Sequence, residues 1–436
     1  MPSNNSPKTP KTFRLDALGI SAKKLDKQAT FVTKQLVENG FQAYLVGGCV
    51  RDLLLGLQPK DFDVATDAKP EQISKIFRNC RLIGRRFRLA HIHFGRHIIE
   101  VATFRGPSEK LKGKYRVIKD GRLLRDNVYG TLEEDAWRRD FTVNALYLDT
   151  IKHTVIDYVD GIKDHQNRTI HLMGDPVTRY KEDPVRLLRA VRFLVKLDFK
   201  LSPETSAPIR ELAPLLNDIP AARLYDEVLK LFLNKKASSV FSALREYDLF
   251  AALFPQTQHC IDNSSDNIAV ELIEHAMLNT EKRLASNQHI APYFLVSTLL
   301  WEPVRQLTKK LRPSFNSDTQ AIHAAANEVI AQQINRIALP KRLTAPMREV
   351  WALQPRFHKR IGVRCIRFMD HPRFRAAYDF MLLRSKHGEI SPNIADWWTK
   401  IQTLTPAEQK AMTQPKKEQK KGRHQANKSD NKIVSN

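Results

Sequence analysis

The stretch GGCVRDLLLGLQPKDFDVAT, residues 47–66, decides the fold of the first part of this chain. The apolar run before it predicts a strand over 42–46 that ends at two glycines. Within the stretch, the pattern predicts a short helix over 50–55 and a second strand over 62–66. Alternation of short strands with short helices therefore begins here, and the rest of the chain can be read outward from it.

Later residues extend this pattern and then change it. Two strands, predicted over 91–94 and 98–103, are expected to pair antiparallel across the turn at Gly95-Arg96. After Asp183 the apolar period becomes helical, with helices predicted over 185–197 and 222–233. Mixed strands with few helices, followed by helices alone, indicate an α+β fold class rather than a doubly wound sheet.

Length and composition divide the chain further. A chain of 436 residues exceeds one ordinary core, so several domains are expected. Between Arg105 and Arg125 basic residues dominate and the apolar period disappears, which predicts a mobile basic loop. The sequence predicts five segments: a flexible basic tail over 1–25, a head of mixed strands and helices over 26–160, a helical neck over 161–235, a further helical region over 236–410, and a disordered basic tail over 411–436.

The net charge of +24, from 71 lysines and arginines against 47 acids, favours a polyanionic partner, and nucleic acid is the first candidate. A solvated basic surface without a dedicated partner is the alternative. The cysteines are scattered without a CxxC pair, which predicts neither a disulfide framework nor a zinc cluster and fits a cytoplasmic location. Neither a signal peptide nor a membrane span is expected.

Two aspartates in the opening stretch carry the first chemical signal. On a strand, residues i and i+2 share a face, so Asp61 and Asp63 are expected side by side. Two close negative charges favour a bound cation, and hard oxygen ligands suit Mg²⁺. Gly47 and Gly48 allow the backbone to approach a triphosphate, with Arg51 adding positive charge. The alternative is a polar turn capped by Asp61, but the preceding GGxxRD element favours the metal.

Three ordered motifs carry a family resemblance. Residues 47–66 resemble motif A of the class II tRNA nucleotidyltransferase and poly(A) polymerase family. RRDFTVNAL (138–146) is similar to motif B, and EDPVRLLRAVRF (182–193) is similar to motif D. The resemblance implies a polymerase beta-like nucleotidyltransferase head followed by all-helical neck, body and RNA-binding domains. It also implies transfer of nucleotides from a triphosphate to an RNA 3′ end, with release of pyrophosphate.

The resemblance assigns catalytic roles to particular residues. Asp61 and Asp63 would hold two Mg²⁺ ions, and Glu100 is the candidate third acidic ligand. Glu100 as an ordinary exposed strand residue remains the equal alternative. Asp140 would support the catalytic centre, and Arg139 would contact the sugar and phosphates of the nucleotide. An Arg-Asp surface pair is the other interpretation of these two residues.

Motif D is expected to read the base. The resemblance implies that Asp183 and Arg186 recognise the Watson–Crick edge of the incoming nucleotide, with Arg189 and Arg192 on the same arginine stripe. Asp183 also suits the N-cap of a helix with Pro184 at its first position, and the stripe also suits a solvated face. Both ATP and CTP offer such an edge, so motif D alone does not decide between them.

Other segments favour the bacterial poly(A) polymerase branch of the family over its CCA-adding branch. Five stretches resemble that branch: residues 84–95, 126–141, 215–232, 340–357 and 371–384. The expected function is therefore template-independent polyadenylation of RNA 3′ ends with ATP, in RNA processing and turnover. The CCA-adding reaction and a non-catalytic RNA-binding protein are the alternatives. Protein partners in RNA decay are possible but follow from no motif.

The C-terminal region supplies the candidate RNA track. Between 341 and 375 ten basic residues stand against two acids, with four aromatic residues interleaved. Basic and aromatic side chains suit single-stranded RNA by phosphate pairing and base stacking. The favoured interpretation places the aromatics in a helical core and only the charges on RNA. The residues expected to bind RNA are Arg356, Arg360, Arg364 and Arg367.

Overall fold

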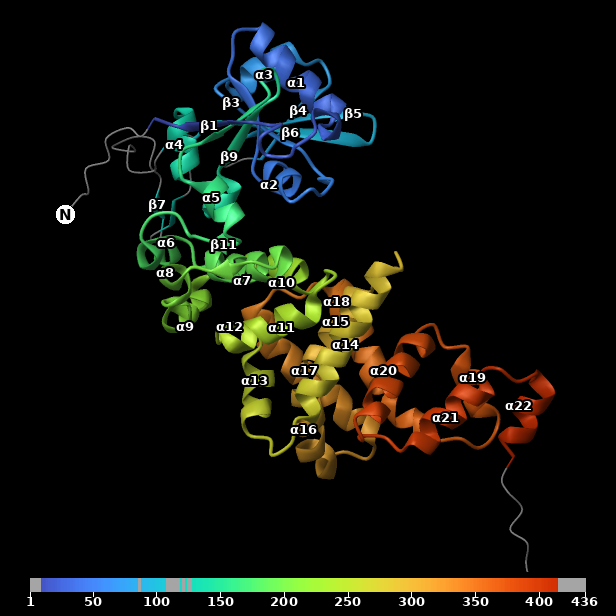
Figure 1. The fold of residues 1–436 in the computed structure, drawn as a ribbon. Helices are drawn as coiled ribbons and strands as arrows, with labels where there is room; N and C mark the ends of the chain where they lie inside the picture. Colours follow the sequence, from blue (N-terminus) through green and yellow to red (C-terminus); the bar gives the residue numbers. More distant parts are fainter. Residues whose placement is uncertain (1–8, 85–87, 107–117, 120–121, 124–127, 415–436) are drawn as a thin grey trace, which may run out of the picture. The chain divides into compact units, whose positions relative to one another are not determined.

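A computed structural model describes residues 9–84, 88–106, 118–119, 122–123 and 128–414 (Figure 1). The chain divides into two compact units. The first comprises Met1–Leu231 and Ser239–Leu253, and the second comprises Phe232–Ser238 and Phe254–Asn436. The mixed sheet lies in the first unit and the second is helical wherever it is described, which confirms the α+β class.

The strands belong to the N-terminal half of the chain. They are β1 (Lys11–Arg14), β2 (Ala43–Val46), β3 (Asp63–Thr66), β4 (Cys80–Ile83), β5 (Leu89–Phe94), β6 (His97–Thr103), β7 (Ile118–Lys119), β8 (Arg122–Leu123), β9 (Leu146–Asp149), β10 (Thr154–Asp157), β11 (Thr169–Ile170) and β12 (Lys200–Leu201).

The helices alternate with these strands and then succeed them. In the first part of the chain they are η1 (Ala22–Lys24), α1 (Lys27–Glu38), α2 (Gly48–Leu54), α3 (Pro70–Ile76), α4 (Leu132–Trp137), η3 (Thr142–Asn144), α5 (Gly161–Gln166), α6 (Pro176–Glu182), α7 (Val185–Leu197), α8 (Pro203–Ser206), α9 (Ile209–Leu212), η4 (Ala213–Asp218), α10 (Ala221–Phe232), α11 (Ala237–Glu246) and α12 (Leu249–Leu253). In the second unit they are α13 (Pro255–Asp262), α14 (Ile268–Ala285), α15 (Pro292–Leu299), α16 (Trp301–Leu311), η5 (Arg312–Ser314), α17 (Asp318–Arg336), α18 (Lys341–Ala352), η6 (Gln354–His358), α19 (Val363–Met369), α20 (Phe374–Lys386), α21 (Pro392–Ile401) and α22 (Pro406–Met412).

An eight-stranded sheet organises the first unit, in the order β1-β10-β9-β2-β3-β6-β5-β4. One pair, β3 and β6, runs parallel, and the other pairs of this sheet run antiparallel. The pair predicted over 91–94 and 98–103 is the antiparallel pair β5 and β6, so that prediction is confirmed. In register, Asp63 of β3 stands between Val46 of β2 and Glu100 of β6.

The two faces of the sheet have different partners. Side chains alternate across a strand, so Val64 and Val101 lie on one face with a large core that includes residues of α1, α2 and α3. Val46 and Ala65 lie on the opposite face, where Leu132 and other residues of a smaller cluster cover them. Asp63 alternates with Val64 and therefore belongs to the less covered face, on which the candidate site forms.

The second unit has an aromatic core near its C-terminal end. Phe357, Phe368, Phe374 and Trp398 are nearly inaccessible, and their rings lie 5.0–6.0 Å apart, mostly edge to face. Trp351 of α18 is also fully buried. The interpretation that the interleaved aromatics are core residues is thus confirmed, and only the charged side chains between them remain candidates for RNA contact.

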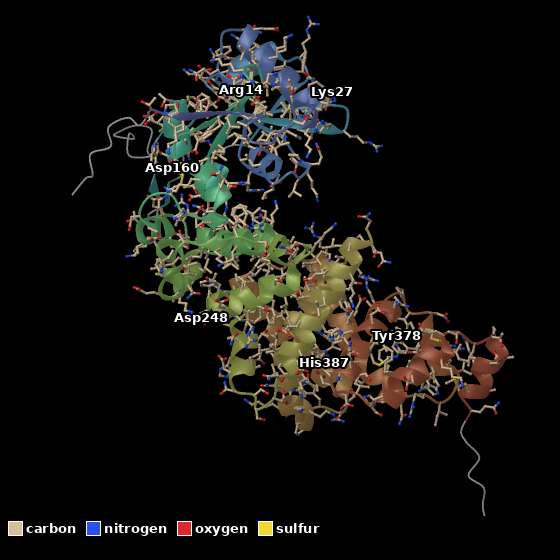
Figure 2. All side chains as sticks on the ribbon, in the orientation of Figure 1. Arg14, Lys27, Asp160, Asp248, Tyr378 and His387 are labelled. Carbon is tan, nitrogen blue, oxygen red and sulfur yellow. The ribbon has the colours of Figure 1, made fainter. Side chains whose placement is uncertain are left out.

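The predicted N-terminal tail over 1–25 is wrong for the part that the structure describes. Residues 11–14 form β1, which pairs antiparallel with β10 along its whole length. Lys11 also forms an ion pair with Asp160, which Figure 2 labels, and Leu15 and Ile20 are buried in the large core. An edge strand exposes most of its side chains, so its sequence looks polar and resembles a tail.

Two other expectations fall partly outside the described residues. Of the predicted basic loop over 105–125, only 105–106, 118–119 and 122–123 are described, and the last two pairs form the antiparallel strands β7 and β8. Of the predicted tail over 411–436, the described part begins in α22, which continues to Met412. No helix among the described residues is both long and apolar enough to cross a membrane.

Candidate active site

A sharp turn connects β2 to α2 at the edge of the site. Gly47 has φ 76° and ψ −125°, a conformation that a residue with a Cβ rarely adopts. A Cβ at this position would lie 3.4 Å from Nη1 of Arg139, so the glycine also lets that guanidinium approach the backbone. The sequence-predicted glycine pair therefore lies beside a motif B arginine, which supports its assignment to a phosphate-binding turn.

The two aspartates lie where β3 begins. Asp63 is the first residue of the strand, and Asp61 precedes it, with the buried Phe62 between them. Both aspartates are exposed. Although Asp63 contacts solvent, nearby protein atoms displace enough water to raise the pKa of its carboxyl to about 6. Glu100 and Asp61 contribute to this rise by their negative charge, whereas Arg139 opposes it.

These carboxylates fit a divalent cation. Burial is the main cause of the raised pKa of Asp63, the negative charges of Glu100 and Asp61 add to it, and a bound cation would offset those charges. Glu100 lies beside Asp63 in the sheet register, but its Oε1 is 3.3 Å from Nε2 of His91. Among the described residues, no group of three or more histidine, cysteine or carboxylate side chains forms a complete metal site. Asp61 and Asp63 suit Mg²⁺ nonetheless, because this ion keeps water and phosphate oxygens as ligands.

Arg51 is buried, with only 3% of its surface accessible. Its guanidinium donates to Oδ1 of Asp52 at 2.6 and 2.9 Å and to Oδ1 of Asn144 at 2.7 Å, and it stacks on the ring of Phe193 at 5.4 Å. Arg51 thus connects α2 with motif B and with α7. Its donors are engaged within the protein, and its contact with a nucleotide therefore stays a prediction.

Arg139 is positioned by Asp135 and Tyr147, which no motif identified as site residues. Its Nη2 lies 3.0 Å from Oδ2 of Asp135, and its Nε donates to the hydroxyl of Tyr147 at 2.9 Å. The same Tyr147 hydroxyl donates to Asp135 at 2.7 Å. Asp135 precedes Arg139 by four residues at the end of α4, a spacing that would have indicated the pair. This closed triangle holds Arg139 against the turn at Gly47.

Asp140 links motif B to motif D. It is 9% exposed, and its Oδ2 lies 2.6 Å from Nη2 of Arg189, although the angle differs from that of an ordinary hydrogen bond. Oδ1 of Asp140 accepts from the backbone N–H of Phe141 at 2.9 Å and from the amide of Asn144 at 3.4 Å. Asp140 is therefore not a loose surface group. Its predicted catalytic role stays a prediction, and its observed role is to tie the two motifs together.

The arginine stripe of α7 is half-buried. Arg186, Arg189 and Arg192 are partly accessible, while the residues between them are buried. Nη1 of Arg186 donates to the carbonyl of Arg179 at 2.6 Å and to Glu182 at 3.1 Å. Burial lowers the pKa of Arg192, which stacks on the Phe193 ring at 5.1 Å. The alternative of a freely solvated arginine face is therefore wrong.

Asp183 is engaged on both oxygens. Oδ1 accepts from the backbone N–H of Val185, the first residue of α7, at 3.3 Å, although the N-cap position is held by Pro184 and not by Asp183 as one interpretation predicted. Oδ2 forms an ion pair at 2.7 Å with Arg223 of α10, a residue that the motifs did not identify. A carboxylate held by a cation offers a base fewer free lone pairs, and the predicted roles of Asp183 and Arg186 in reading the base stay predictions.

Comparisons with known proteins connect this geometry to a family. Models described as the poly(A) polymerase head domain, the probable RNA- and SrmB-binding site of polymerase A, and the polymerase A arginine-rich C-terminus match residues 43–171, 198–261 and 315–432. Poly(A) polymerase I of Salmonella typhi is 46% identical over 399 residues, which cover 90% of this chain and 86% of that protein. This chain belongs to the poly(A) polymerase family.

The CCA-adding branch is related over a shorter stretch. The CCA-adding enzyme of Bacillus licheniformis is 38% identical over 220 residues, 50% of this chain and 53% of that enzyme. Among solved structures, the Thermotoga maritima CCA-adding enzyme in complex with tRNA has a TM-score of 0.61 at 19% identity, covering 89% of this chain and 85% of that one. That likeness shows the fold. The resemblance to the poly(A) polymerase branch, in contrast, extends through the C-terminal region.

The predicted RNA-binding arginines lie in the polymerase's second unit, in η6, α19 and the residues between them. Arg364 and Arg367 are exposed on α19. Arg360 is half-buried, and its Nη1 donates to the carbonyl of Asn393 at 3.4 Å. The guanidinium of Arg356 lies 4.2 Å from the centre of the Phe368 ring, so this residue also packs on the aromatic core. The four are thus not equivalent.

Proposed function

We propose that this nucleotidyltransferase extends RNA 3′ ends with AMP from ATP, without a template, and releases pyrophosphate. The observation that carries the proposal is the exposed carboxylate pair Asp61 and Asp63 at the start of β3, beside the turn at Gly47 and the fixed Arg139. Poly(A) polymerase I, to which the chain is similar over nine-tenths of its length, supplies the substrate class by its name.

The protein residues divide the work of holding the substrates. Gly47 and Gly48 leave the backbone open to the triphosphate, and Arg139 is directed at the same turn by Asp135 and Tyr147. Asp61 and Asp63 would hold two Mg²⁺ ions. When bound, this ion pair supplies charge stabilisation to the attacking 3′-oxygen and to the leaving pyrophosphate. Positioning the RNA end in line with the α-phosphorus is the remaining task of the protein.

Base selection is assigned to the start of α7. Arg186 would donate to a ring nitrogen of adenine, while Asp183 accepts from the exocyclic amine only to the extent that Arg223 permits. Arg189 is committed to Asp140, and Arg192 lies over Phe193. Because each arginine is already held, the pocket would select by a fixed shape instead of adapting to each base.

Transfer assays with single nucleotides test the proposal against the CCA-adding reaction. The purified chain is incubated with an unstructured RNA and ATP alone, then with CTP alone, and in parallel with a tRNA that lacks its 3′ end. A long ladder with ATP on the unstructured RNA supports polyadenylation. One to three additions that require the tRNA would identify a CCA-adding enzyme instead. No incorporation on either RNA would contradict both reactions.

We also place this activity in the cytoplasm, in mRNA processing and RNA turnover. Four free cysteines, two in each unit, favour a reducing compartment. Measuring the tail lengths of cellular RNAs in cells that lack the chain tests the assignment, since unchanged tails would contradict a role in RNA processing.

A further inference from the structure

An open hollow lies in the second unit, at residues other than the arginines already discussed. Its volume is about 490 Å³, and it lies between the chain that follows η5 and the first half of α17. Phe315 and Asn316 line it from the first segment, and Gln320, His323 and Asn327 line it from the helix. The spacing of the three helical residues places them on one face of α17, as expected for positions i, i+3 and i+7.

Local bonds fix the shape of this hollow. Oγ of Ser317 caps α17 by accepting from the backbone N–H of Gln320 at 3.3 Å. Arg312 donates to the carbonyl of Phe315 at 2.7 Å and forms an ion pair with Asp318, so the segment before the helix is held at both ends. The hollow is therefore a preformed feature of this unit, as small-molecule and nucleotide sites commonly are.

The lining residues on α17 do not pack in the hydrophobic core. Gln320, His323 and Asn327 are exposed, while the opposite face of α17, including Ala321, Ala325 and Val329, is buried. Oδ1 of Asn327 accepts from Nε of Arg348 at 2.7 Å, so its amide nitrogen is the end directed to other partners. Substitutions at the exposed positions should therefore change a surface and leave the packing of the helix intact.

Three features of the hollow suit an unpaired base of RNA. Phe315 is a half-buried aromatic residue on which a base can stack. Gln320 and Asn327 carry neutral amides, which offer a donor and an acceptor together, and amides match the N6 and N7 groups of adenine in particular. Exposed cations, Lys309, Lys310 and Arg312, lie on the adjoining α16 and η5 and favour a phosphate backbone nearby.

We propose that this hollow binds an unpaired adenosine of single-stranded RNA. A site for phosphate alone would place cations in the lining, whereas this lining offers an aromatic ring and neutral amides. The proposal rests on the proposed function and deepens it, because the product of polyadenylation is a run of unpaired adenosines. The hollow is a second RNA subsite, distinct in its residues from both motif D and the arginines of α19.

Equilibrium binding tests the proposal without catalysis. Fluorescently labelled oligoadenylate and oligocytidylate of equal length are titrated with the full chain, in chelator and without ATP. Phe315→Ala should weaken oligoadenylate binding by roughly five- to tenfold, since a stacked base contributes that much or more. Gln320→Leu should reduce the preference for oligoadenylate over oligocytidylate, and serves as the second variant if Phe315→Ala unfolds. Gln332→Leu, an exposed amide on the same helix outside the lining, is the matched control.

Each outcome decides the matter. Loss confined to oligoadenylate in both lining variants supports the adenosine subsite. An equal loss for both oligonucleotides overturns the assignment to adenine, and unchanged binding of both overturns an RNA site here and leaves a protein ligand. Because the measurement needs no transfer, a parent chain that binds oligoadenylate through Phe315 but incorporates no AMP would disprove the proposed function and leave this site standing.

Discussion

The carboxylates at the start of β3 and the arginines of α7 belong to the same unit but are held in opposite ways. Asp61 and Asp63 are exposed, and the pKa of Asp63 is raised by burial and then by the negative charges of Glu100 and Asp61. Arg186 and Arg189 instead have protein partners at 2.6 Å. The first group gains stability only from a ligand, whereas the second is preorganised by the fold. The proposed metal ligands and the proposed base-reading residues thus differ in how far the protein itself engages them.

The largest effect is expected at Asp61 and Asp63, the proposed ligands of the cations. Asp61→Ala and Asp63→Ala should each reduce AMP transfer by about a thousandfold or more, because several kcal/mol of transition-state stabilisation depend on the aligned cations. Folding and RNA affinity should stay near the parent values, since both side chains are exposed. Single-turnover incorporation, thermal unfolding and RNA titration measure the three quantities.

A neighbouring carboxylate provides the control for this experiment. Asp67 follows the same strand and accepts from the backbone N–H of Gln42 at 2.8 Å, so it has a structural partner. Asp67→Asn should leave transfer within a few-fold of the parent rate. Near-parental incorporation by Asp61→Ala in Mg²⁺ would contradict the assignment of the metal ligands.

The next effect concerns the support of Arg139. Asp135 is 6% exposed and accepts from Arg139 and Tyr147, so Asp135→Asn should lower the free energy of unfolding by about 3 kcal/mol. Burial alone would raise the pKa of Asp135, but Arg139 and the hydrogen bonds outweigh it, and the pKa lies below its ordinary value. The stabilisation is thus present above the unfolded-state pKa, about 3.9, and is lost as the pH falls through the lower folded-state pKa.

Urea unfolding at pH 7 and at acid pH measures this contribution. The difference between parent and Asp135→Asn should be full at pH 7 and should shrink below about pH 4. Glu133→Gln, on the same helix and half-exposed, should change stability by less than about 0.5 kcal/mol. An Asp135→Asn variant as stable as the parent at pH 7 would show that Arg139 is held by other contacts.

Base selection should respond more weakly, because the proposal distributes it over several residues of α7. Arg186→Ala should reduce the preference for ATP over CTP by about tenfold or somewhat more, the amount expected of one good contact to a base edge. Asp183→Ser can keep the hydrogen bond to the start of α7 but removes the carboxylate that Arg223 already engages. Its effect on preference should therefore be smaller than that of Arg186→Ala.

Competition between ATP and CTP, measured together with thermal unfolding, shows whether Asp183 only stabilises the start of α7 or also contacts the base. If Asp183→Ser selects ATP as strongly as the parent, Asp183 only stabilises the start of α7 and pairs with Arg223. A loss of preference at unchanged thermal stability would instead make this carboxylate a reader of the base. Lys196→Ala, at the exposed end of the same helix, is the control.

The smallest effects are expected from single arginines of the second unit. Arg364→Gln and Arg367→Gln should each lower the dependence of RNA affinity on salt by roughly 0.7 in the log–log slope, if each contacts one phosphate of a single strand. Arg356→Gln should also lose about 0.5–1 kcal/mol of stability, because its guanidinium lies over Phe368. Slopes that do not change in either α19 variant would remove those residues from the RNA track.

The sequence by itself determined the elements around the catalytic edge. The helix predicted over 185–197 has those bounds, because its apolar residues repeat with the helical period. The strand predicted over 62–66 begins one residue later, at Asp63, and Asp61 therefore precedes the sheet. Spacing also brought Asp61 and Asp63 together as a candidate, since two residues on an extended chain share a side by local geometry.

Only the tertiary structure decided which charges are engaged. Asp135, Asn144 and Arg223 belong to none of the roles assigned from the motifs, yet they hold Arg139, Arg51 and Asp183. Arg223 is 40 residues from Asp183, and Asn144 is 93 residues from Arg51, so no local pattern reveals these pairs. β1 was missed for the same reason: its partner β10 lies far along the chain, and an edge strand needs pairing more than apolar side chains. Local periodicity specifies elements, whereas burial and long-range pairing specify which side chains remain available to a substrate.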